Sequence, residues 1–399
     1  SETSLNSGVP ISVFETPSRD SMFMLRTDYS REPSWWTRHM RLMHRALSPR
    51  APLLRRKENR YLEIMDRPAP AFDQLTPDLA LSAVGEAFGI EPDGSFFAYP
   101  SYANRVYGFR SDTGDEYVAK FYRPGRWTPE AILEEHAFVA ELAEAEIPVV
   151  APLPDLYGET LPELVVQGDA GETSFPFALF PKKGGRLFDA EREEDWLRLG
   201  ALAGRIHAIG AKRPFRHRVR IEPRLLSSYS DEILGGETVH PDCAGPLASK
   251  LRQAASIVDA ALDAAGRAPI RLHGDFHRGN VLDRAGSGLQ AIDFDDAASG
   301  PAVQDLWLLL PGPAMECRRE RGLIVEGYEA FMPFDRSTLA LVEPLRLLRM
   351  VHFIAWQARQ RSDRGFLDRF DGWGSKEFWL SLSVDLEDQI ERVQESAST

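Results

Sequence analysis

Cysteine is scarce in this sequence of 399 residues, since Cys243 and Cys317 are the only two. Two cysteines cannot build a disulfide framework or, without other ligands, a structural zinc site, so we expect a reducing, cytoplasmic setting. Long apolar runs are lacking too: no stretch approaches the roughly 18 apolar residues that a membrane-spanning helix requires. The N-terminus has no short apolar core followed by small residues, which argues against secretion. We therefore expect no association with a membrane.

Basic residues are also in deficit, because 47 Lys and Arg stand against 60 Asp and Glu and give a net charge of −13. Residues 1–65 are the exception: they are basic, rich in scattered Ser, Pro and Arg, and show little apolar periodicity. We predict a flexible extension there, or sequence upstream of a start at Met65; a basic docking arm is the alternative. The acidic remainder repels a phosphate backbone, so nucleic acid is not an expected partner. We expect a monomer.

Residues 66–181 have the pattern of a small α+β unit. Thr76 followed by Pro77 is a helix start signal, and apolar residues recur at helical spacing as far as Phe88. Two strand-like runs flank the turn signal at residues 111–114, and the further elements follow in order. The predicted strands are 104–110, 116–122, 164–167 and 176–180, and the long predicted helix is 129–146. A glycine-containing linker, 182–185, then leads to the second half.

Residues 182–399 read as mainly helical. The apolar spacing predicts helices at 195–209, 247–265, 304–310, 316–331, 336–361 and 377–395. Two short apolar runs, Ile270–Leu272 and Leu289–Ile292, are strand candidates, and polar residues crowd immediately after each of them. No internal repeat or low-complexity tract is evident.

Those polar residues form the densest constellation in the chain. His273 to Asn280 reads HGDFHRGN, and Asp293 follows the second strand candidate. Phosphoryl transfer needs positioning and charge neutralisation, and Mg²⁺ prefers oxygen ligands. We predict that Asp275 orients the acceptor hydroxyl and that Asn280 and Asp293 bind Mg²⁺. Gly274 and Gly279 let the loop double back, so that Asp275 and Asn280 face one site, which Asp293 enters from the next strand.

Two alternatives concern the same segment. An ordinary acidic turn would not need two strands that each end in carboxylates together with a correctly spaced Asn. A metal pair formed by His273 and His277 would need a helix, which Gly274 and Gly279 disfavour. We expect His273 to brace the loop by bonding to backbone or to Asp293. Asp305 is predicted to open a helix and to accept backbone hydrogen bonds from the catalytic loop.

The phosphates of ATP need a cation, and Lys120 lies late in a predicted strand. A helix follows that carries Glu134 and Glu135, either of which could pair with the lysine. The turn before the strand pair is not G-x-G-x-x-G, so Ser101 and Asn104 would have to donate to phosphate in its place. Phe180, at the end of the last predicted strand of this unit, is expected to mark the hinge whose backbone meets adenine.

Several longer motifs resemble a known family. The loop His273–Asn280 with Asp293 resembles the aminoglycoside-phosphotransferase branch of the kinase-like fold, and other segments resemble the bacterial stress response kinase A family more specifically. Those segments are SYANRVY at 101–107, KFYRP at 120–124, RWT at 126–128, ILEEH at 132–136, GGR at 184–186, GPAVQDLW at 300–307 and EPLR at 343–346. They run in the right order from about Phe72 to Ala355.

The resemblance implies an α+β, two-lobed kinase-like fold with an antiparallel sheet in a small N-lobe (66–181) and a mainly helical C-lobe (182–399). It implies a Ser/Thr protein kinase, dependent on ATP and Mg²⁺ and linked to stress survival. It makes Asp275 and Asp293 catalytic, Asn280 and Asp293 Mg²⁺ ligands, and Ser101 an ATP-site residue. Phe276 departs from the small residue or Cys common in the family, and residues 1–65 have no counterpart.

Two competing functions stay open from the sequence. The first is a small-molecule kinase for an aminoglycoside, choline-like or sugar hydroxyl, since the same catalytic loop serves those acceptors. The region 304–361 should wall the acceptor site and decide between them. The second is a nucleotide-binding scaffold without catalysis, which the joint presence of Lys120, Asp275, Asn280 and Asp293 disfavours.

Overall fold

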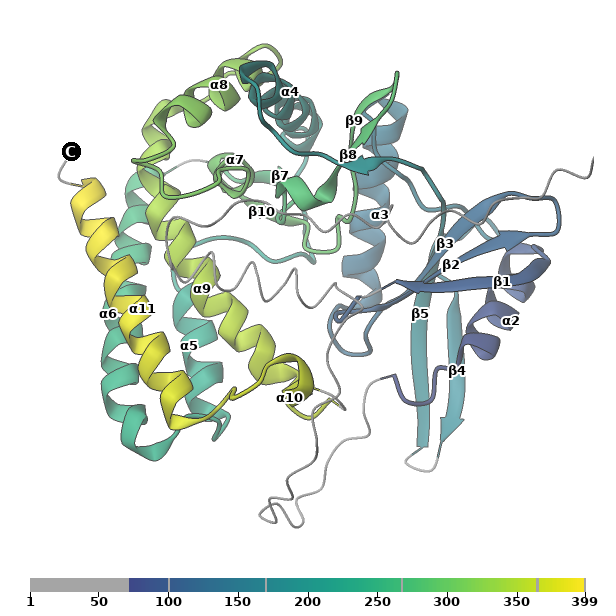
Figure 1. Cartoon of the computed structure of the whole chain (residues 1–399), viewed down its shortest axis with the longest axis horizontal. Helices are drawn as coiled ribbons and strands as arrows, with labels where there is room; N and C mark the ends of the chain where they lie inside the picture. The colour runs from purple at the N-terminus through teal and green to yellow at the C-terminus, as the bar shows by residue number, and fades with distance from the viewer. Residues whose placement is uncertain (1–71, 100, 169–170, 267, 364–365, 398–399) are drawn as a thin grey trace, which may run out of the picture. The chain divides into compact units, whose positions relative to one another are not determined.

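A computed structural model of the chain describes residues 72–99, 101–168, 171–266, 268–363 and 366–397. The predicted extension, 1–65, lies outside the described residues. We call residues 72–181 the sheet part and residues 182–397 the helical part (Figure 1). Within the described ranges, no helix combines the length and the apolar character needed to cross a bilayer.

The sheet part is built on five antiparallel strands in the order β1-β2-β3-β5-β4. The strands are β1 (Pro92–Tyr99), β2 (Arg105–Ser111), β3 (Glu116–Phe121), β4 (Glu163–Gly168) and β5 (Gly171–Pro181). Four of these five strands, β2 to β5, were predicted from the sequence. The sequence did not predict β1, because this edge strand is exposed on both faces and so has no alternation of apolar and polar residues.

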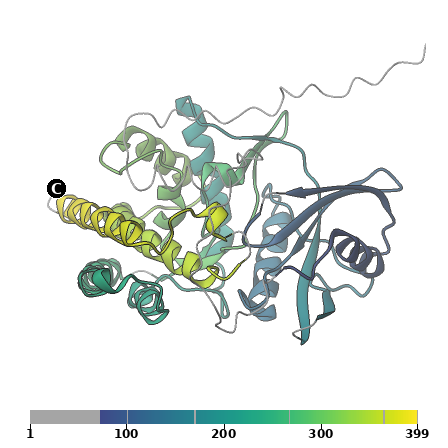
Figure 2. The ribbon, with the colours of Figure 1, turned by 60° about the horizontal axis from the view of Figure 1, so that its bottom comes forward.

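Helix α2 (Pro77–Phe88) begins and ends as its sequence dictates. The Thr76 side chain accepts a hydrogen bond from the amide of Leu79, Pro77 stands in the first turn, and Gly89 closes the helix with a left-handed φ of 65°. Its buried face packs on the sheet, where the rings of Phe121 and Phe177 stack 4.8 Å apart. Figure 2 shows α2 lying against one face of the strands.

Helix α3 (Pro129–Glu144) forms in the connection between β3 and β4, close to the predicted range. Thr128 caps its first turn, and Ile132 packs with Tyr122 and Ala178, in a cluster separate from the one beneath α2. Successive side chains of a strand point to opposite faces, so Ala119 and Phe121 join the α2 core while Lys120 points to the other face. That alternation directs the lysine away from α2.

The helical part contains α4 (Glu193–Gly210), α5 (Leu225–Gly235), α6 (Pro241–Ala265), α7 (Val303–Leu308), α8 (Arg318–Glu329), α9 (Val342–Arg359), α10 (Phe366–Arg369) and α11 (Lys376–Ala397). In both views α5, α6, α9 and α11 lie side by side (Figures 1 and 2). Six of these helices match predicted segments, and α5 and α10 were missed. The predicted helix 336–361 is divided into the 3-10 turn Arg336–Leu341 and α9, because Pro344 has no amide hydrogen to continue an α-helical ladder.

Short strands hold the loops between these helices. β7 (Ile270–Leu272) pairs with β10 (Ala298–Gly300), and β8 (Val281–Arg284) pairs with both β6 (Arg186–Leu187) and β9 (Gly288–Ala291). A 3-10 turn, Arg278–Asn280, leads directly into β8. The two predicted strand candidates are confirmed as β7 and β9, and the polar segment after each forms the site described next.

Candidate active site

The loop after β7 is held by its own half of the chain. Asp305, at the start of α7, accepts hydrogen bonds from the amides of His273 (2.8 Å) and Gly274 (2.9 Å). It also accepts one from Nε2 of His207 at 2.9 Å. All three side-chain contacts are buried, so the predicted role of Asp305 as a brace is confirmed.

Two further features fix the path of this loop. His273 donates from Nε2 to the carbonyl of Ile292 at 2.9 Å, which confirms the expected bond to backbone. Gly274 has a φ of 82°, and a Cβ placed there would lie 1.9 Å from the carbonyl oxygen of Asp296. Only glycine satisfies both conditions, because other residues rarely adopt this φ and every one of them carries a Cβ.

Asp275 and Asn280 are brought together by the turn between them. Asn280 donates from Nδ2 to the carbonyl of Asp275 at 3.0 Å, and its own carbonyl accepts from the amide of Ile292 at 3.0 Å. The second bond places the loop beside Asp293. The three side chains predicted to act together therefore lie on two adjoining loops, as the glycine spacing indicated.

The carboxylate of Asp275 meets an arginine that the sequence did not single out. Nη2 of Arg349, on α9, donates to Oδ1 at 2.6 Å, while Nε2 of His277 lies 3.6 Å from Oδ2. Burial alone would raise the pKa of Asp275, but the charge of Arg349, with further contributions from the nearby His277 and His273, outweighs it and holds this pKa well below its usual range. Asp275 is thus a fixed anion with one oxygen occupied.

Asp293 stands in a backbone conformation that is uncommon for its residue type. Its φ is 63°, and its side chain is 55% exposed, unlike those of its neighbours. Such conformations are costly and cluster at functional sites. This exposed carboxylate is one of the two groups that the sequence predicts as metal ligands; Asn280 is the other.

Asp295, two residues later, is the buried centre of an ionic network. It receives Lys120 at 3.1 Å, the Arg126 guanidinium, and Nδ2 of Asn104 at 3.1 Å. Burial would raise its pKa, yet Arg126, Lys120 and Arg218 hold it well below its usual range. Lys120, Arg126 and Asn104, which contact the Asp295 carboxylate, all come from the sheet part. Arg218, which donates to the backbone carbonyl of Asp295, comes from the helical part.

Lys120 joins the two halves of the site. Its Nζ lies 3.1 Å from Oδ1 of Asp293 and 3.1 Å from Oδ1 of Asp295, with a side chain only 11% exposed. Burial alone would lower the pKa of this ammonium, but the two carboxylates keep it above its ordinary value. The lysine therefore lies beside the loop that contains Asp293, as predicted.

The structure corrects the predicted partner of Lys120, which pairs with aspartates and not with a glutamate. Neither Glu134 nor Glu135 forms an ion pair with it in the described residues; Glu135 lies 3.7 Å from Arg218, and Glu134 accepts the amides of Arg216 and His217. Asp293 and Asp295 pair with the lysine because they approach it directly from the adjoining loop. Glu135 is buried, which raises its pKa to about 7, and it acts on the lysine only as a nearby charge.

The side chain of Asn104 already has two hydrogen-bond partners. It is 3% exposed, its Nδ2 donates to Asp295, and its Oδ1 accepts the amide of Arg123 at 3.2 Å. Asn104 therefore fixes the loop at residues 101–104, and its donation to phosphate stays a prediction. Ser101, by contrast, is half-buried, and its hydroxyl accepts a long bond from the amide of Asn104 at 3.5 Å.

Phe180 lies in β5 opposite Val118 of β3 and packs against the cluster around Tyr122 and Ile132. Two residues later, the amide of Lys182 donates to the backbone carbonyl of Glu116 at 2.8 Å. The chain leaves the sheet at this point, where the hinge was predicted.

Three residues of the site were not assigned a role from the sequence. Arg126 and Asp295 stand next to assigned motifs, and their charge was the available signal. Arg349 carries no local signal, because it is an arginine within a helix that lies 74 positions from its partner. Only the packing of α9 against the loop reveals it.

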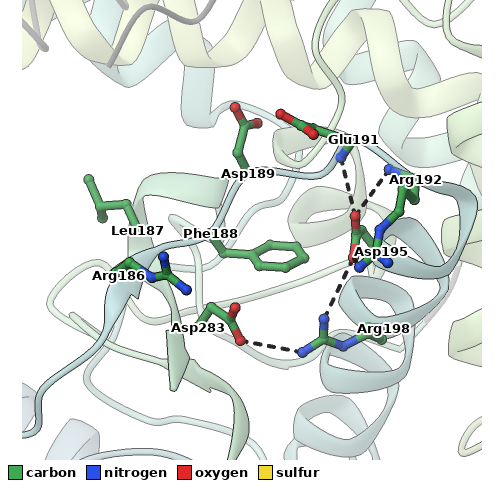
Figure 3. Close-up of a pocket in the computed structure, with 9 residues that line it drawn as sticks. All are labelled: Arg186, Leu187, Phe188, Asp189, Glu191, Arg192, Asp195, Arg198 and Asp283. Carbon is green, nitrogen blue, oxygen red and sulfur yellow. Dashed lines mark hydrogen bonds and ion pairs between the residues drawn. The ribbon is translucent and has the colours of Figure 1, made fainter. Parts of the chain in front are cut away.

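A separate pocket of about 410 Å³ lies between β6, β8 and the start of α4 (Figure 3). Its charges pair among themselves: Arg198 contacts both Asp195 and Asp283. The ion pair between Asp189, which lines this pocket, and Arg278 of the catalytic loop measures 2.8 Å. None of the predicted site residues lines it.

Comparisons with known proteins identify the family of this chain. Residues 98–342 match the phosphotransferase enzyme family. The chain is 38% identical to stress response kinase A of Escherichia coli (strain K12) and 36% identical to the serine/threonine protein kinase RdoA of Salmonella typhimurium (strain LT2). Each alignment covers 83% of this chain and 97% of the relative.

Among solved structures, the amicoumacin kinase hAmiN in complex with AMP-PNP and Ca²⁺ superposes with a TM-score of 0.60. The match covers 79% of this chain and 94% of that one, at 18% identity, and so supports the fold alone. The predicted α+β kinase-like fold is confirmed, with an antiparallel sheet in the N-terminal part and a helical remainder. The chain belongs to the stress response kinase A family within the phosphotransferase enzyme family, and it is a kinase.

Proposed function

We propose that this kinase uses Mg²⁺ and ATP to phosphorylate Ser or Thr hydroxyls of protein substrates in the stress response. One observation carries the proposal: Lys120 of the sheet part lies 3.1 Å from Asp293 of the loop that adjoins Asp275 and Asn280. A cation for phosphates, oxygen ligands for a metal and a carboxylate for the acceptor thereby converge. The names of the relatives favour a protein acceptor.

Asp275 is the group we assign to the acceptor. Because Arg349 holds Oδ1, the remaining oxygen is the one that would accept the hydrogen bond of the attacking hydroxyl. A carboxylate with a lowered pKa is a weak base, so its main contribution would be orientation of the hydroxyl. Holding the carboxylate in place before the substrate binds lowers the entropic cost of reaching the transition state.

Asn280 and Asp293 fit a Mg²⁺ ion that is bound partly by the protein and partly by the phosphates of the nucleotide. Asn280 and Asp293 offer oxygens only, and the described part of the chain contains no cluster of three or more His, Cys, Asp or Glu that could hold a metal by itself. Mg²⁺ is commonly bound by one or two protein groups together with substrate phosphates. When bound, the ion would neutralise charge on the transferring phosphoryl group.

The nucleotide would lie between the two parts. We assign the phosphates to Lys120 and Ser101 and the adenine to backbone near Phe180, with Glu135 acting on Lys120 as a nearby charge. Asn104 would support this site by holding the loop in place. We further propose that residues 66–181 and 182–399 are its two lobes, and that the protein is a cytoplasmic monomer.

The substitution Asp275→Ala tests the assignment of the acceptor group. We expect phosphate transfer to fall by about 10²- to 10⁴-fold, the usual contribution of such a group, while Mg²⁺–ATP affinity changes little. The measurement is transfer from labelled ATP together with nucleotide binding by calorimetry. Asp283→Ala, which removes a half-exposed carboxylate, is the matched control. Undiminished transfer by Asp275→Ala would refute the assignment.

A substrate panel with labelled ATP tests the acceptor class. Proteins and Ser/Thr peptides should be labelled, whereas amino alcohols, aminoglycosides and choline should not. Chelation of Mg²⁺ with EDTA should abolish labelling. Labelling confined to the small molecules would replace the protein-kinase proposal with the alternative that the sequence left open.

A further inference from the structure

The loop before β2, residues 101–104, is held by an arginine that also contacts the helical part. The guanidinium of Arg123 donates from Nη2 to the carbonyl of Tyr102 at 2.8 Å and from Nε to the carbonyl of Ala103 at 3.1 Å. Nη1 of the same group lies 2.8 Å from Oδ2 of Asp363, in the helical part. One side chain therefore joins the backbone of this loop to a carboxylate of the other part of the molecule.

The ring of Tyr102 makes a second contact between the same two parts. Its centroid lies 5.8 Å from that of Trp356 on α9 and 5.8 Å from that of Phe370, in both cases edge to face. The guanidinium of Arg123 lies 5.6 Å from the centre of the tyrosine ring, and that of Arg369, on α10, lies 5.0 Å from it. These aromatic and cation–π contacts add to the ion pair and act on the same loop.

The ion pair is shielded from water, since the side chains of Arg123 and Asp363 are 10% and 15% exposed. A guanidinium presents its N–H donors in a planar fork, so one group can serve two carbonyls and a carboxylate at once. Exposed ion pairs contribute little, whereas loss of one partner from a shielded pair leaves the other charge uncompensated. These contacts should therefore restrain the loop in one conformation.

Ser101, which we assign to the phosphates of ATP, depends on its neighbours for its position. Its hydroxyl accepts a long hydrogen bond from the amide of Asn104 at 3.5 Å. Asn104 is held in turn by Asp295 at 3.1 Å, and the residue directly after the serine is Tyr102. The place of the serine is thus set from one side by Asn104 and from the other by the contacts of Tyr102.

Helix α9 connects this loop with the acceptor site. Arg349 of α9 donates to Asp275 at 2.6 Å, and Trp356 of the same helix contacts Tyr102. These two positions on α9 are almost two turns apart, or about 10 Å along the axis, and so lie on the same side of the helix. One helix therefore contacts both the acceptor carboxylate and the loop that we assign to phosphate.

We propose that Tyr102, Arg123 and Asp363, here called the loop clamp, are positioning residues that hold the loop 101–104 in the form that binds the phosphates of ATP. The inference rests on the nucleotide site proposed above and identifies what keeps that site assembled before ATP binds. The clamp acts through Ser101 and not by contact with the reacting atoms. Loss of the clamp should therefore lower the population of loops able to bind ATP, and leave the chemistry of the bound complex in place.

The test measures Mg²⁺–ATP binding by calorimetry and steady-state kinetics in the full-length chain. Asp363→Ala should weaken binding and raise the KM for ATP about five- to tenfold, as expected if about one loop in five to ten remains competent. The kcat at saturating ATP should change less than about twofold, because bound ATP then holds the loop. Arg123→Lys should weaken binding similarly, since an ammonium lacks the fork that serves two carbonyls and a carboxylate.

Further measurements separate positioning from general stability. Combining Arg123→Lys with Asp363→Ala should weaken binding no more than the weaker single variant, because both changes act on one contact. Hydrogen exchange at residues 101–104 should be faster in Asp363→Ala and slow again when Mg²⁺–ATP is added. Arg205→Gln is the control: it removes a different bond between the two parts, to the carbonyl of Glu146 at 2.7 Å, and should keep the parent's KM for ATP.

Each contrary result has its own meaning. A folded Asp363→Ala protein with the parent's affinity and KM for ATP would overturn the clamp while the kinase function stands. If that variant does not fold, the same result in Arg123→Lys would overturn it. An equal rise in KM caused by Arg205→Gln would also do so, because any contact between the parts would then serve. If the parent itself binds no Mg²⁺–ATP, the proposed nucleotide site fails and the clamp with it.

Discussion

The two loops of the site are held in different ways. The catalytic loop is braced by Asp305, His207 and the carbonyl of Ile292, which all belong to the helical part and make buried hydrogen bonds. The loop of Asp293 and Asp295 is held mainly by ion pairs and hydrogen bonds from the sheet part. The position of the acceptor group is therefore set within one part, whereas the position of the metal and phosphate groups depends on contact between both.

This difference predicts separable functions. Disturbing the catalytic loop should reduce turnover at a given occupancy of nucleotide. Disturbing the ionic network should weaken nucleotide and Mg²⁺ binding and the docking of the two parts. Three substitutions, taken from the largest expected effect to the smallest, test the distinction.

Asp295→Ala should have the largest effect on stability. It leaves Lys120 and Arg126 buried with fewer counter-charges, and breaking a buried pair typically costs about 3–5 kcal/mol. The KM for ATP and the Mg²⁺ requirement should rise as well, because Lys120 loses the carboxylate that positions it. Denaturant unfolding and steady-state kinetics measure the two effects.

The control for that experiment is Asp283→Ala, which breaks a half-exposed pair with Arg198 at 3.5 Å. Surface pairs contribute about 0–1 kcal/mol, so this variant should unfold almost as the parent does. Equal losses in the two variants would show that burial of the ionic network does not matter.

Asp305→Asn should mainly affect turnover. The amide group of Asn must face one of the donors that Asp305 now accepts, and loss of a hydrogen bond to a charged group costs about 1.5–3 kcal/mol. The catalytic loop would loosen, so kcat should fall while the KM for ATP stays close to the parent value. A rise in the KM for ATP as large as that caused by Asp295→Ala would contradict the separation of the two loops.

The same contrast explains what the sequence could predict. The catalytic loop is local: its glycines, its spacing and the strands on either side all lie within residues 270–293, and its brace was recognised from a helix-opening Asp305. The helix α2 likewise carries its cap at Thr76 and its stop at Gly89 in adjacent sequence. Elements whose physics is local were predicted with nearly correct bounds.

The contacts between distant segments could not be predicted in this way. Lys120 had plausible partners in Glu134 and Glu135 a short distance along the chain, but Asp293 and Asp295 reach it from more than 170 positions away. Arg349 meets Asp275 only because α9 packs beside the loop. The charge of a buried side chain indicates that it needs an ion-pair partner, but the tertiary packing determines which residue that partner is.

His136 offers the smallest test and probes the ionic side of the comparison through pH. Its ring is buried between Tyr122 and Thr160, and burial together with the charges of Lys120 and Arg218 lowers its pKa to about 3. The unfolded chain binds a proton near pH 6.5, so the folded state loses stability as pH falls from about 6.5 toward 3. At pH 5 this loss should reach about 2 kcal/mol relative to pH 7. His136→Gln should be less stable at pH 7, where it loses a hydrogen bond, yet its unfolding free energy should fall less between pH 7 and pH 5. The exposed His217→Gln should keep the parent's slope, and an unchanged slope in His136→Gln would show that the ring does not carry this linkage.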